Sequence, residues 1–214
     1  MSASYDPERM FSYLKGLAIG RDWHDTLQAL YIARHAHAHQ TRKSGEPYII
    51  HPLTVACHLV AMGIMEDPII ATALLHDFKE DCDGDIDALP CVEAVRHAID
   101  LVSFDKNWYL ENTGLQKQEA LRVHYAAIAK DKIATLVKLA DRCNNVSTMA
   151  GVFNTEKLVE YIDETRTYVL PLVRTAKNQW PECSDSLFIM KYHITTATDA
   201  IEATMNMFRS DHSA

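Results

Sequence analysis

The sequence predicts an all-α fold in a single domain, and three observations support this prediction. A chain of 214 residues is long enough for one well-buried domain and too short for two enzymatic domains of ordinary size. The composition is ordinary for a globular protein, with 48% apolar and 23% charged residues. Only 7 glycines and 7 prolines punctuate the chain, so its elements are long, and apolar residues recur along them at helical spacing.

The charge and the cysteines restrict the classes of function. A net charge of −8, without a basic run or interleaved aromatic and basic residues, argues against non-specific nucleic-acid binding. A phosphorylated ligand therefore needs a local cluster of Lys and Arg. The 5 cysteines are odd in number and form no C-x-x-C pair, which favours reduced thiols in the cytoplasm.

The chain is expected to consist of a main domain with short additions at each end. The N-terminal segment, 1–21, lacks the uninterrupted apolar region of a signal peptide. The most apolar zone, 55–75, is interrupted by charged residues and a proline, so no run reaches membrane-spanning length. We expect the main domain over 22–182, and a C-terminal helix within 183–214 that packs on the same domain.

Helical periodicity, caps and turn residues place the elements. Asp67 followed by Pro68 predicts an N-cap and a first helical position, and Pro171 is expected to kink or divide its helix. The segment 105–114 is expected to be a polar loop, and 83–85 a turn. Helices are expected over 22–39, 52–63, 67–81, 92–104, 131–149, 156–176 and 185–209.

The octapeptide L-L-H-D-F-K-E-D at 74–81 carries more polar chemistry than a packing face needs. On a regular helix, at about 100° per residue, His76, Asp77, Glu80 and Asp81 share one face. The His76-Asp77 pair offers an imidazole and a hard oxygen ligand to one divalent cation, while Glu80 can act on water without being a ligand. The alternative interpretation is a solvated acidic helix end.

His51 is predicted to lie where a helix begins. Gly45 and Pro47 mark a turn before it, and Pro52 suits the first helical position and favours extended backbone at His51. A histidine held there can point out of the helix end as a ligand, although a lone histidine also suits a cap or the core. The three histidines of H-A-H-A-H at 35–39 cannot all bind one metal from a regular helix.

One polar stripe runs along the predicted helix 131–149. Lys138, Asp141, Asn145 and Thr148 lie within about 80° of one another, beside the buried face. A solvent-exposed stripe is the ordinary interpretation of such a pattern. Its position at the edge of the buried face also suits the wall of a cleft.

Three widely separated segments together supply a set of metal ligands. His51, His76, Asp77 and Asp141 provide two imidazoles and two carboxylates. A mixed nitrogen and oxygen set suits manganese, iron, cobalt or zinc rather than calcium.

Three motifs, in this order, resemble a known family. They are R-K-S-G-E-P-Y-I-I-H-P at 42–52, L-L-H-D-x-x-E-D at 74–81 and K-L-A-D-R-x-x-N at 138–145. Over about 31–172 the sequence is similar to the HD-domain hydrolases of the RelA/SpoT type, which remove the 3′-pyrophosphate from guanosine tetra- and pentaphosphate. The resemblance implies an all-helical HD-domain bundle and one divalent transition ion, manganese, bound per chain.

The resemblance also implies roles for individual residues. The positions that match the family's metal ligands are His51, His76, Asp77 and Asp141. The positions that match its catalytic acidic pair are Glu80 and Asp81. The substrate-binding positions are Arg42, Lys43 and Ser44 in the loop that meets the nucleotide, with Arg42 against the base, and Asn145 and Thr148 in the pocket.

Several positions depart from the family's pattern. Leu89-Pro90-Cys91 stands where many members have Phe-Gly, and 103–106 replaces a more usual Val-Thr-Lys, with only Lys106, after Asp105, in common. Lys79 replaces a commonly apolar or small residue and is expected to bring a positive charge near the pyrophosphate. The chain ends before the synthetase and regulatory domains of long members, so we expect a stand-alone small alarmone hydrolase.

The leading hypothesis is metal-dependent hydrolysis of guanosine tetra- and pentaphosphate to GDP or GTP and pyrophosphate. Two alternatives are also enzymes: one performs the same reaction on adenosine alarmones, and the other is a general HD-type phosphatase of nucleoside monophosphates or NADPH. A third, of a different class, is a silent nucleotide-binding module. The expected partner is a small nucleotide alarmone in the cytoplasm, without nucleic acid or membrane, and a homo-oligomer is left open.

Overall fold

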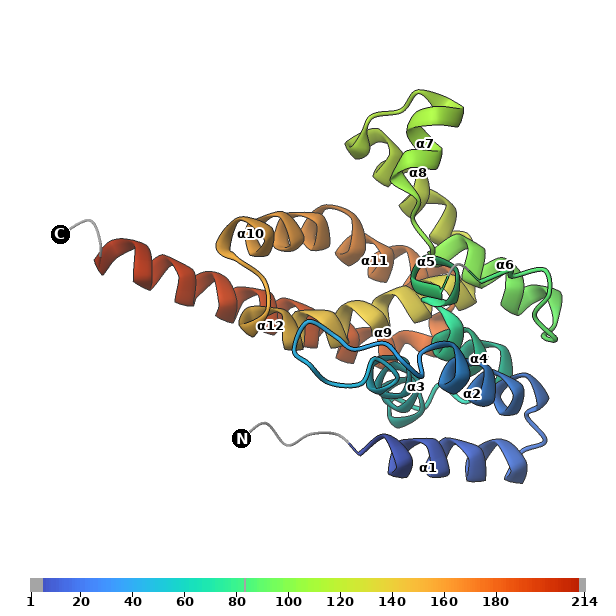
Figure 1. The fold of residues 1–214 in the computed structure, drawn as a ribbon. Helices are drawn as coiled ribbons and strands as arrows, with labels where there is room; N and C mark the ends of the chain where they lie inside the picture. The colour runs from blue at the N-terminus through green and yellow to red at the C-terminus, as the bar shows by residue number, and fades with distance from the viewer. Residues whose placement is uncertain (1–5, 83, 212–214) are drawn as a thin grey trace.

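The computed structural model describes residues 6–82 and 84–211, and every regular element in these ranges is helical. An isolated bridge pairs Thr41 with Pro47, and the described ranges contain no strand. The predicted all-α fold is therefore confirmed (Figure 1). The α-helices are α1 (Pro7–Gly20), α2 (His24–Ala36), α3 (Ile50–Ala61), α4 (Asp67–Leu75), α5 (Phe78–Cys82), α6 (Glu93–Val102), α7 (Lys106–Thr113), α8 (Lys117–Ile128), α9 (Lys132–Thr148), α10 (Thr155–Glu164), α11 (Leu170–Gln179) and α12 (Ser184–Asp211).

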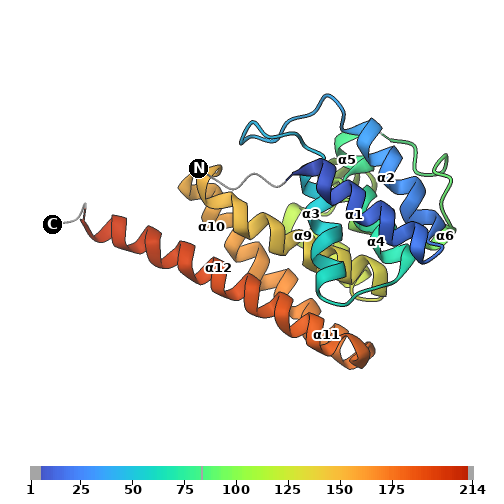
Figure 2. The same cartoon turned by 90° about the horizontal axis from the view of Figure 1, so that it is seen from below.

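Helix α4 forms the centre of the bundle. Its residues from Ile69 to Leu75 are all buried, as expected of a helix that is apolar on every side. Helices α2, α3, α6 and α9 pack around it, and α1 lies outside α2 and α3 (Figure 2). The last turn of α4 is therefore held from all sides.

The predicted N-cap role of Asp67 is wrong for its own helix. Helix α4 begins at Asp67 itself, with Glu66 as the N-cap residue. The Asp67 carboxylate instead accepts hydrogen bonds from the backbone N–H groups of Asp25, at 3.1 Å, and Thr26, at 2.7 Å. Because the first N–H groups of a helix lack intrahelical partners, Asp67 caps α2 and fixes the starts of two helices side by side.

The segment 105–114, predicted to be a loop, forms helix α7. Asp105 caps the helix by accepting a hydrogen bond from the backbone N–H of Trp108 at 2.9 Å. Gly114 ends it with a φ of 70°, a conformation that favours glycine. The prediction failed because it rested on polar composition and overlooked the two caps. Helix α7 projects from the body of the bundle (Figure 1), whereas Leu121, Tyr125 and Ile128 of α8 pack in the main core.

A π-helical turn, Thr165–Val169, separates α10 from α11 just before Pro171, as the predicted kink or division requires. The buried Arg142 guanidinium of α9 donates to Thr165 Oγ1 at 2.9 Å and to Glu164 Oε1 at 2.7 Å. These hydrogen bonds join the π-helical turn and the end of α10 to α9.

The long helix α12 lies on α9 and α11 (Figure 2). Its residues Leu187, Met190 and Ile194 are fully buried in the main core. Its later turns cover a smaller cluster, formed by Val146, Met149, Leu158 and Ile162. Within the described residues, no helix has the length and apolar character needed to cross a membrane.

Candidate metal centre and active site

Four side chains meet where α4 ends. His76 and Asp77 follow α4, His51 comes from the first turn of α3, and Asp141 comes from α9. The two Nε2 atoms lie 3.2 Å apart. His51 Nε2 is 3.5 Å from an oxygen of Asp77 and 3.2 Å from one of Asp141. The corresponding distances from His76 Nε2 are 3.3 and 3.6 Å.

The hydrogen bonds formed by Nδ1 of His51 and Nδ1 of His76 show which ring nitrogens carry protons. His76 Nδ1 lies 2.8 Å from the backbone carbonyl of Ala73, which can only accept, so this nitrogen donates. His51 Nδ1 is likewise 2.7 Å from Oδ1 of Asn144. Each neutral ring then points the lone pair of Nε2 at the other ring, beside two carboxylates. This arrangement is favourable only with a positive charge among the four donors.

The donor set fits a divalent transition metal. Ligand atoms about 2.0–2.2 Å from one ion lie roughly 3.0–3.6 Å apart in octahedral or tetrahedral geometry. The distances from the two histidine nitrogens to each other and to the nearest carboxylate oxygens fall in that range. The chemistry of two imidazoles and two carboxylates also suits such an ion. The structure thus brings all four predicted ligands together.

The pKa values of these groups reflect the same need for positive charge. Burial lowers the pKa of His76, but the charges of Asp77 and Asp141 outweigh it and raise the pKa to about 9. Burial raises the pKa of Asp141, whereas hydrogen bonds with His51 and His76 hold it well below its usual value. In the absence of a metal, the raised pKa keeps a proton on His76 at neutral pH, and a bound cation would replace this proton at Nε2. The lowered pKa of Asp141 favours the ionised carboxylate, which is the form that binds metal.

Two local predictions for the ligands were wrong. Helix α4 stops at Leu75 and α5 restarts at Phe78, so 76–81 is not one regular helix and its four polar side chains do not share a helical face. A continuous helix would carry charged residues along a fully buried axis, and the break avoids this. His51 is helical rather than extended, because α3 begins one residue before it. Pro52 is tolerated in the first turn, where an N–H has no intrahelical partner.

Tyr48 connects a predicted ligand to a predicted catalytic residue, although the sequence reasoning overlooked it. Its hydroxyl donates to an Asp77 oxygen at 2.7 Å and also contacts the Asp81 carboxylate. Its ring stacks on the buried ring of His37, with centroids 4.7 Å apart. The signal was available, because Tyr48 lies three positions before His51 within the first motif.

Tyr48→Phe is expected to weaken metal binding by about 10- to 100-fold, the usual cost of losing a hydrogen-bond partner behind a ligand. The substitution keeps the ring stacked on His37 and removes only the hydroxyl that bonds to Asp77. Competition with a chelator of known affinity measures the change. Tyr13→Phe, at an exposed tyrosine of α1, is the matched control and should bind metal normally. Unchanged affinity in Tyr48→Phe would contradict this role.

Glu80 is held by the backbone of a distant segment. Its Oε1 accepts a hydrogen bond from the N–H of Phe104 at 2.6 Å. This contact lies in a segment whose side chains depart from the family's pattern, but it uses only the backbone. Burial raises the pKa of Glu80, against the opposing effects of Lys138 and the Phe104 N–H. A carboxylate with a raised pKa and access to the cavity is suited to accept a proton.

The residues of the predicted site line one cavity of about 1000 Å³. Every residue predicted to bind metal, to act in catalysis or to contact substrate lines it: Arg42, Lys43, Ser44, His51, His76, Asp77, Glu80, Asp81, Asp141, Asn145 and Thr148. Lys138, Phe153 and Lys157 also line it. The Lys157 ammonium lies 4.6 Å from the centre of the Phe153 ring. Phe153 and Lys157 follow the last motif, so no sequence signal pointed to them.

Arg42 holds the loop between α2 and α3 against α9. Its guanidinium donates to Oδ1 of Asn144 and Oδ1 of Asn145, each at 3.2 Å. Asn145 in turn donates to an Asp141 oxygen at 2.7 Å. The Thr148 hydroxyl is turned to the backbone carbonyl of Asn144 at 3.2 Å. The loop residues and the polar stripe of α9 therefore lie in contact and line neighbouring parts of one cavity.

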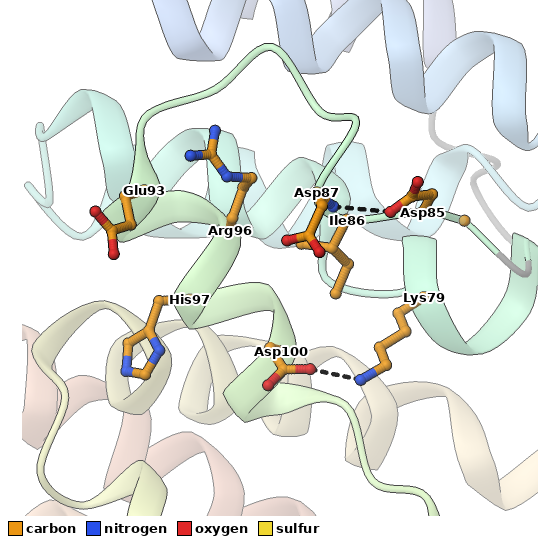
Figure 3. Close-up of a pocket in the computed structure, with 9 residues that line it drawn as sticks. Lys79, Asp85, Ile86, Asp87, Glu93, Arg96, His97 and Asp100 are labelled. Carbon is orange, nitrogen blue, oxygen red and sulfur yellow. Dashed lines mark hydrogen bonds and ion pairs between the residues drawn. The ribbon is translucent and has the colours of Figure 1, made fainter.

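Lys79 does not line this cavity. The expectation that it brings a positive charge near the pyrophosphate is therefore wrong. It lines a second cavity of about 620 Å³ between α5 and α6, where its ammonium donates to Asp100 (Figure 3). Asp85, Asp87 and Glu93 also line this second cavity, which makes it unfavourable for a phosphorylated ligand. Of the predicted turn 83–85 beside it, Asp83 lies outside the described residues.

Comparison with known proteins decides the family. A sequence profile described as "HD domain" matches residues 29–172, which include all the residues just described. The chain belongs to the HD-domain family. The His76-Asp77 pair that follows α4 lies within the matched range.

Two curated relatives of this HD-domain chain carry the same name, guanosine-3′,5′-bis(diphosphate) 3′-pyrophosphohydrolase. The protein of Aquifex aeolicus is 37% identical over 145 residues, which are 68% of this chain and 20% of that protein. The protein of Vibrio cholerae is 40% identical over 149 residues, 68% of this chain and 21% of that protein. The chain thus spans about a fifth of the length of these relatives.

A solved structure is similar over most of the chain. It is described as a metazoan ortholog of SpoT that hydrolyzes ppGpp and plays a role in starvation responses. Its TM-score is 0.62 at 25% sequence identity, and the match covers 83% of this chain and 95% of the solved one. Unlike the bacterial relatives, this neighbour is matched over almost its whole length.

Proposed function

We propose that the protein is a hydrolase that removes the 3′-pyrophosphate from guanosine tetra- and pentaphosphate, giving GDP or GTP and pyrophosphate. One observation carries the proposal: two imidazoles, two carboxylates and the separate carboxylate of Glu80 line the same cavity as Arg42 and Lys43. The activities named for the similar proteins agree with this proposal.

The domain and its setting form part of the proposal. We assign the hydrolase domain to 22–182, with an N-terminal segment, 1–21, before it and a C-terminal helix within 183–214 that packs on it. The odd number of cysteines and the lack of a C-x-x-C pair favour reduced thiols in the cytoplasm. The preferred ion is manganese, one per chain, held by His51, His76, Asp77 and Asp141. When bound, the ion lowers the pKa of water towards neutrality and polarises phosphate oxygens.

The acidic pair would move the proton. Glu80 accepts the proton of the attacking water, helped by a pKa that burial has raised. Asp81 is held by the Tyr48 hydroxyl and orients the water or Glu80. Attack at the phosphorus bonded to the ribose 3′ oxygen breaks that bond, releases pyrophosphate whole, and leaves the proton on the ribose oxygen.

Two neighbouring parts of the cavity would hold the nucleotide. In one part, Lys43 balances phosphate charge and Arg42 can leave its two asparagine partners to stack on a purine base. In the other, Asn145 and Thr148 lie about 6 and 10.5 Å beyond Asp141 along the helix axis, which spans a ribose and base. This arrangement leaves the 3′ substituent nearest the four ligands.

Product analysis tests the proposed reaction. We expect anion-exchange chromatography, after incubation with manganese and a panel of guanosine and adenosine 3′-pyrophosphates, to show pyrophosphate and a nucleoside 5′-di- or triphosphate. NADPH and nucleoside monophosphates serve as controls and should remain intact. Orthophosphate as the first product, or equal activity on nucleotides without a 3′ substituent, would instead support a general phosphatase.

A further inference from the structure

Lys138 brings a positive charge into the cavity of about 1000 Å³ without a carboxylate to neutralise it. Its half-buried ammonium donates to the backbone carbonyl of Val102 at 3.1 Å. Among the described residues no aspartate or glutamate forms an ion pair with it, whereas Lys79, Lys117 and Lys132 each form one. An ammonium has three N–H donors, so two are left for a ligand. A partly buried charge of this kind is favourable when a ligand supplies the counter-charge.

One short backbone segment fixes Lys138 and Glu80 beside each other. The carbonyl of Val102 accepts from Lys138, and the N–H of Phe104, two residues later, donates to Glu80 Oε1 at 2.6 Å. Both side chains line the cavity. The charge of Lys138 opposes the rise in the pKa of Glu80, as expected of a cation close to this carboxylate. Lys138 therefore lies in the part of the cavity where Glu80 would accept the proton of water.

The position of Lys138 along α9 places it beyond the metal ligands, away from the proposed nucleoside site. Asp141 lies three residues after Lys138, about 4.5 Å along the helix axis at about 1.5 Å per residue. Asn145 and Thr148 lie about 6 and 10.5 Å further towards the C-terminal end of the helix. A nucleotide with its base near Thr148 and its 3′ phosphorus near Asp141 therefore directs its outer phosphate towards Lys138.

The carboxylates in this part of the cavity make a cation necessary for such a substrate. Asp77, Asp141, Glu80 and Asp81 all line it, and a divalent ion offsets only part of their negative charge. A pyrophosphate group would otherwise meet a negative potential there. An ammonium beside the outer phosphate removes this repulsion and forms charge-assisted hydrogen bonds.

The other cations that line the cavity are engaged elsewhere. Arg42 donates to two asparagines of α9, and the buried Arg142 to a glutamate of α10. The ammonium groups of Lys43 and Lys157 lie 5.9 and 4.6 Å from the centre of the Phe153 ring. None of these contacts involves the backbone segment that holds the proposed base.

We propose that Lys138 binds the outer phosphate of the 3′-pyrophosphate and so selects a 3′-diphosphate over a 3′-monophosphate. The inference rests on the proposed function for the direction in which the nucleotide lies. With the outer phosphate on Lys138, the phosphorus bonded to the ribose lies at the four ligands, next to Glu80. Attack there breaks the bond to the ribose 3′ oxygen, whereas attack at the outer phosphorus would release orthophosphate. The contact with Lys138 therefore favours the release of pyrophosphate whole.

Isothermal titration calorimetry of the manganese-loaded chain, with inorganic pyrophosphate and with orthophosphate, tests the inference. Lys138→Gln removes the charge and keeps a donor for the Val102 carbonyl. Its affinity for pyrophosphate should fall by about 10- to 100-fold, the usual cost of losing a hydrogen bond between charged groups. Its affinity for orthophosphate should change little, because one phosphate at the ligands does not reach a side chain one turn away. Lys130→Gln, at an exposed lysine before α9, is the matched control and should bind both anions normally.

Two further variants separate charge from structure. Lys138→Arg keeps the charge and should retain most of the pyrophosphate affinity. Lys138→Met has a similar length without the charge and should show the same difference between the two anions as Lys138→Gln. Elemental analysis and circular dichroism check that each variant holds its ion and is folded.

Unchanged pyrophosphate affinity in Lys138→Gln and Lys138→Met, or an equal loss of affinity for both anions, would overturn the assignment of Lys138. The titration involves no hydrolysis, so it is independent of the product analysis. A chain that binds pyrophosphate through Lys138 but leaves alarmones intact would contradict the proposed function alone. A chain that hydrolyses alarmones while Lys138→Gln binds pyrophosphate normally would contradict the role of Lys138 alone.

Discussion

Asp141→Ala is expected to abolish metal binding and hydrolysis together. One Asp141 oxygen lies 3.2 Å from His51 Nε2 and 3.6 Å from His76 Nε2, so its removal opens one side of the donor set. The remaining imidazoles and the Asp77 carboxylate carry one negative charge fewer. The loss of metal affinity should exceed the roughly 10- to 100-fold cost of losing a partner behind a ligand.

Elemental analysis of the purified, folded variant measures this loss. The wild-type chain should contain one transition ion, and Asp77→Ala should behave like Asp141→Ala. Two controls should keep the ion: Asp163→Ala, at an exposed aspartate of α10, and His37→Ala, whose Nδ1 bonds to Gln40 at 2.7 Å. Stoichiometric metal in a folded Asp141→Ala protein would show that the ligands are assigned wrongly.

The sequence predicted helices best where the spacing of apolar residues within one segment determines the structure. Helical spacing over 131–149 matches α9, and the same reasoning over 185–209 matches α12 within a few residues. Local patterns failed where a tertiary contact decides the outcome. Asp67 follows the rule for an N-cap, yet its carboxylate caps α2, because two helix ends meet in the fold. The break after Leu75 depends in the same way on the burial of α4.

The grouping of the four candidate ligands was predictable from the sequence, but the contacts that hold them in place were not. The residue types and order of the three motifs pointed to the ligands, since such mixed sets have few other uses. Nothing in one sequence says that Asn144 accepts a hydrogen bond from Nδ1 of His51, 93 positions away. Lys157 and Phe153 join the cavity only because the turn after α9 folds back over it. Such contacts arise from tertiary structure and leave no periodic signal.

Glu80→Gln is expected to leave the metal content intact while it lowers turnover by roughly 100- to 10,000-fold, the usual contribution of a positioned acid or base. The amide oxygen can still accept the hydrogen bond from Phe104, which is 2.6 Å from the carboxylate, so the side chain should keep its place. What the variant loses is the ability to take a proton. Glu160→Gln, an exposed glutamate of α10, is the matched control and should retain full activity.

The pH profile adds a second measurement for Glu80. Burial raises its pKa, so the wild-type turnover should fall with acidification at a higher pH than an ordinary glutamate would give. The direction follows from the role, because a base is inactive once protonated, and a raised pKa moves that protonation upward in pH. The Gln variant has no such group, so its low residual turnover should lose this acidic decline over the range in which elemental analysis still finds metal. A variant with wild-type turnover, or with an unchanged acidic decline, would show that another group accepts the proton.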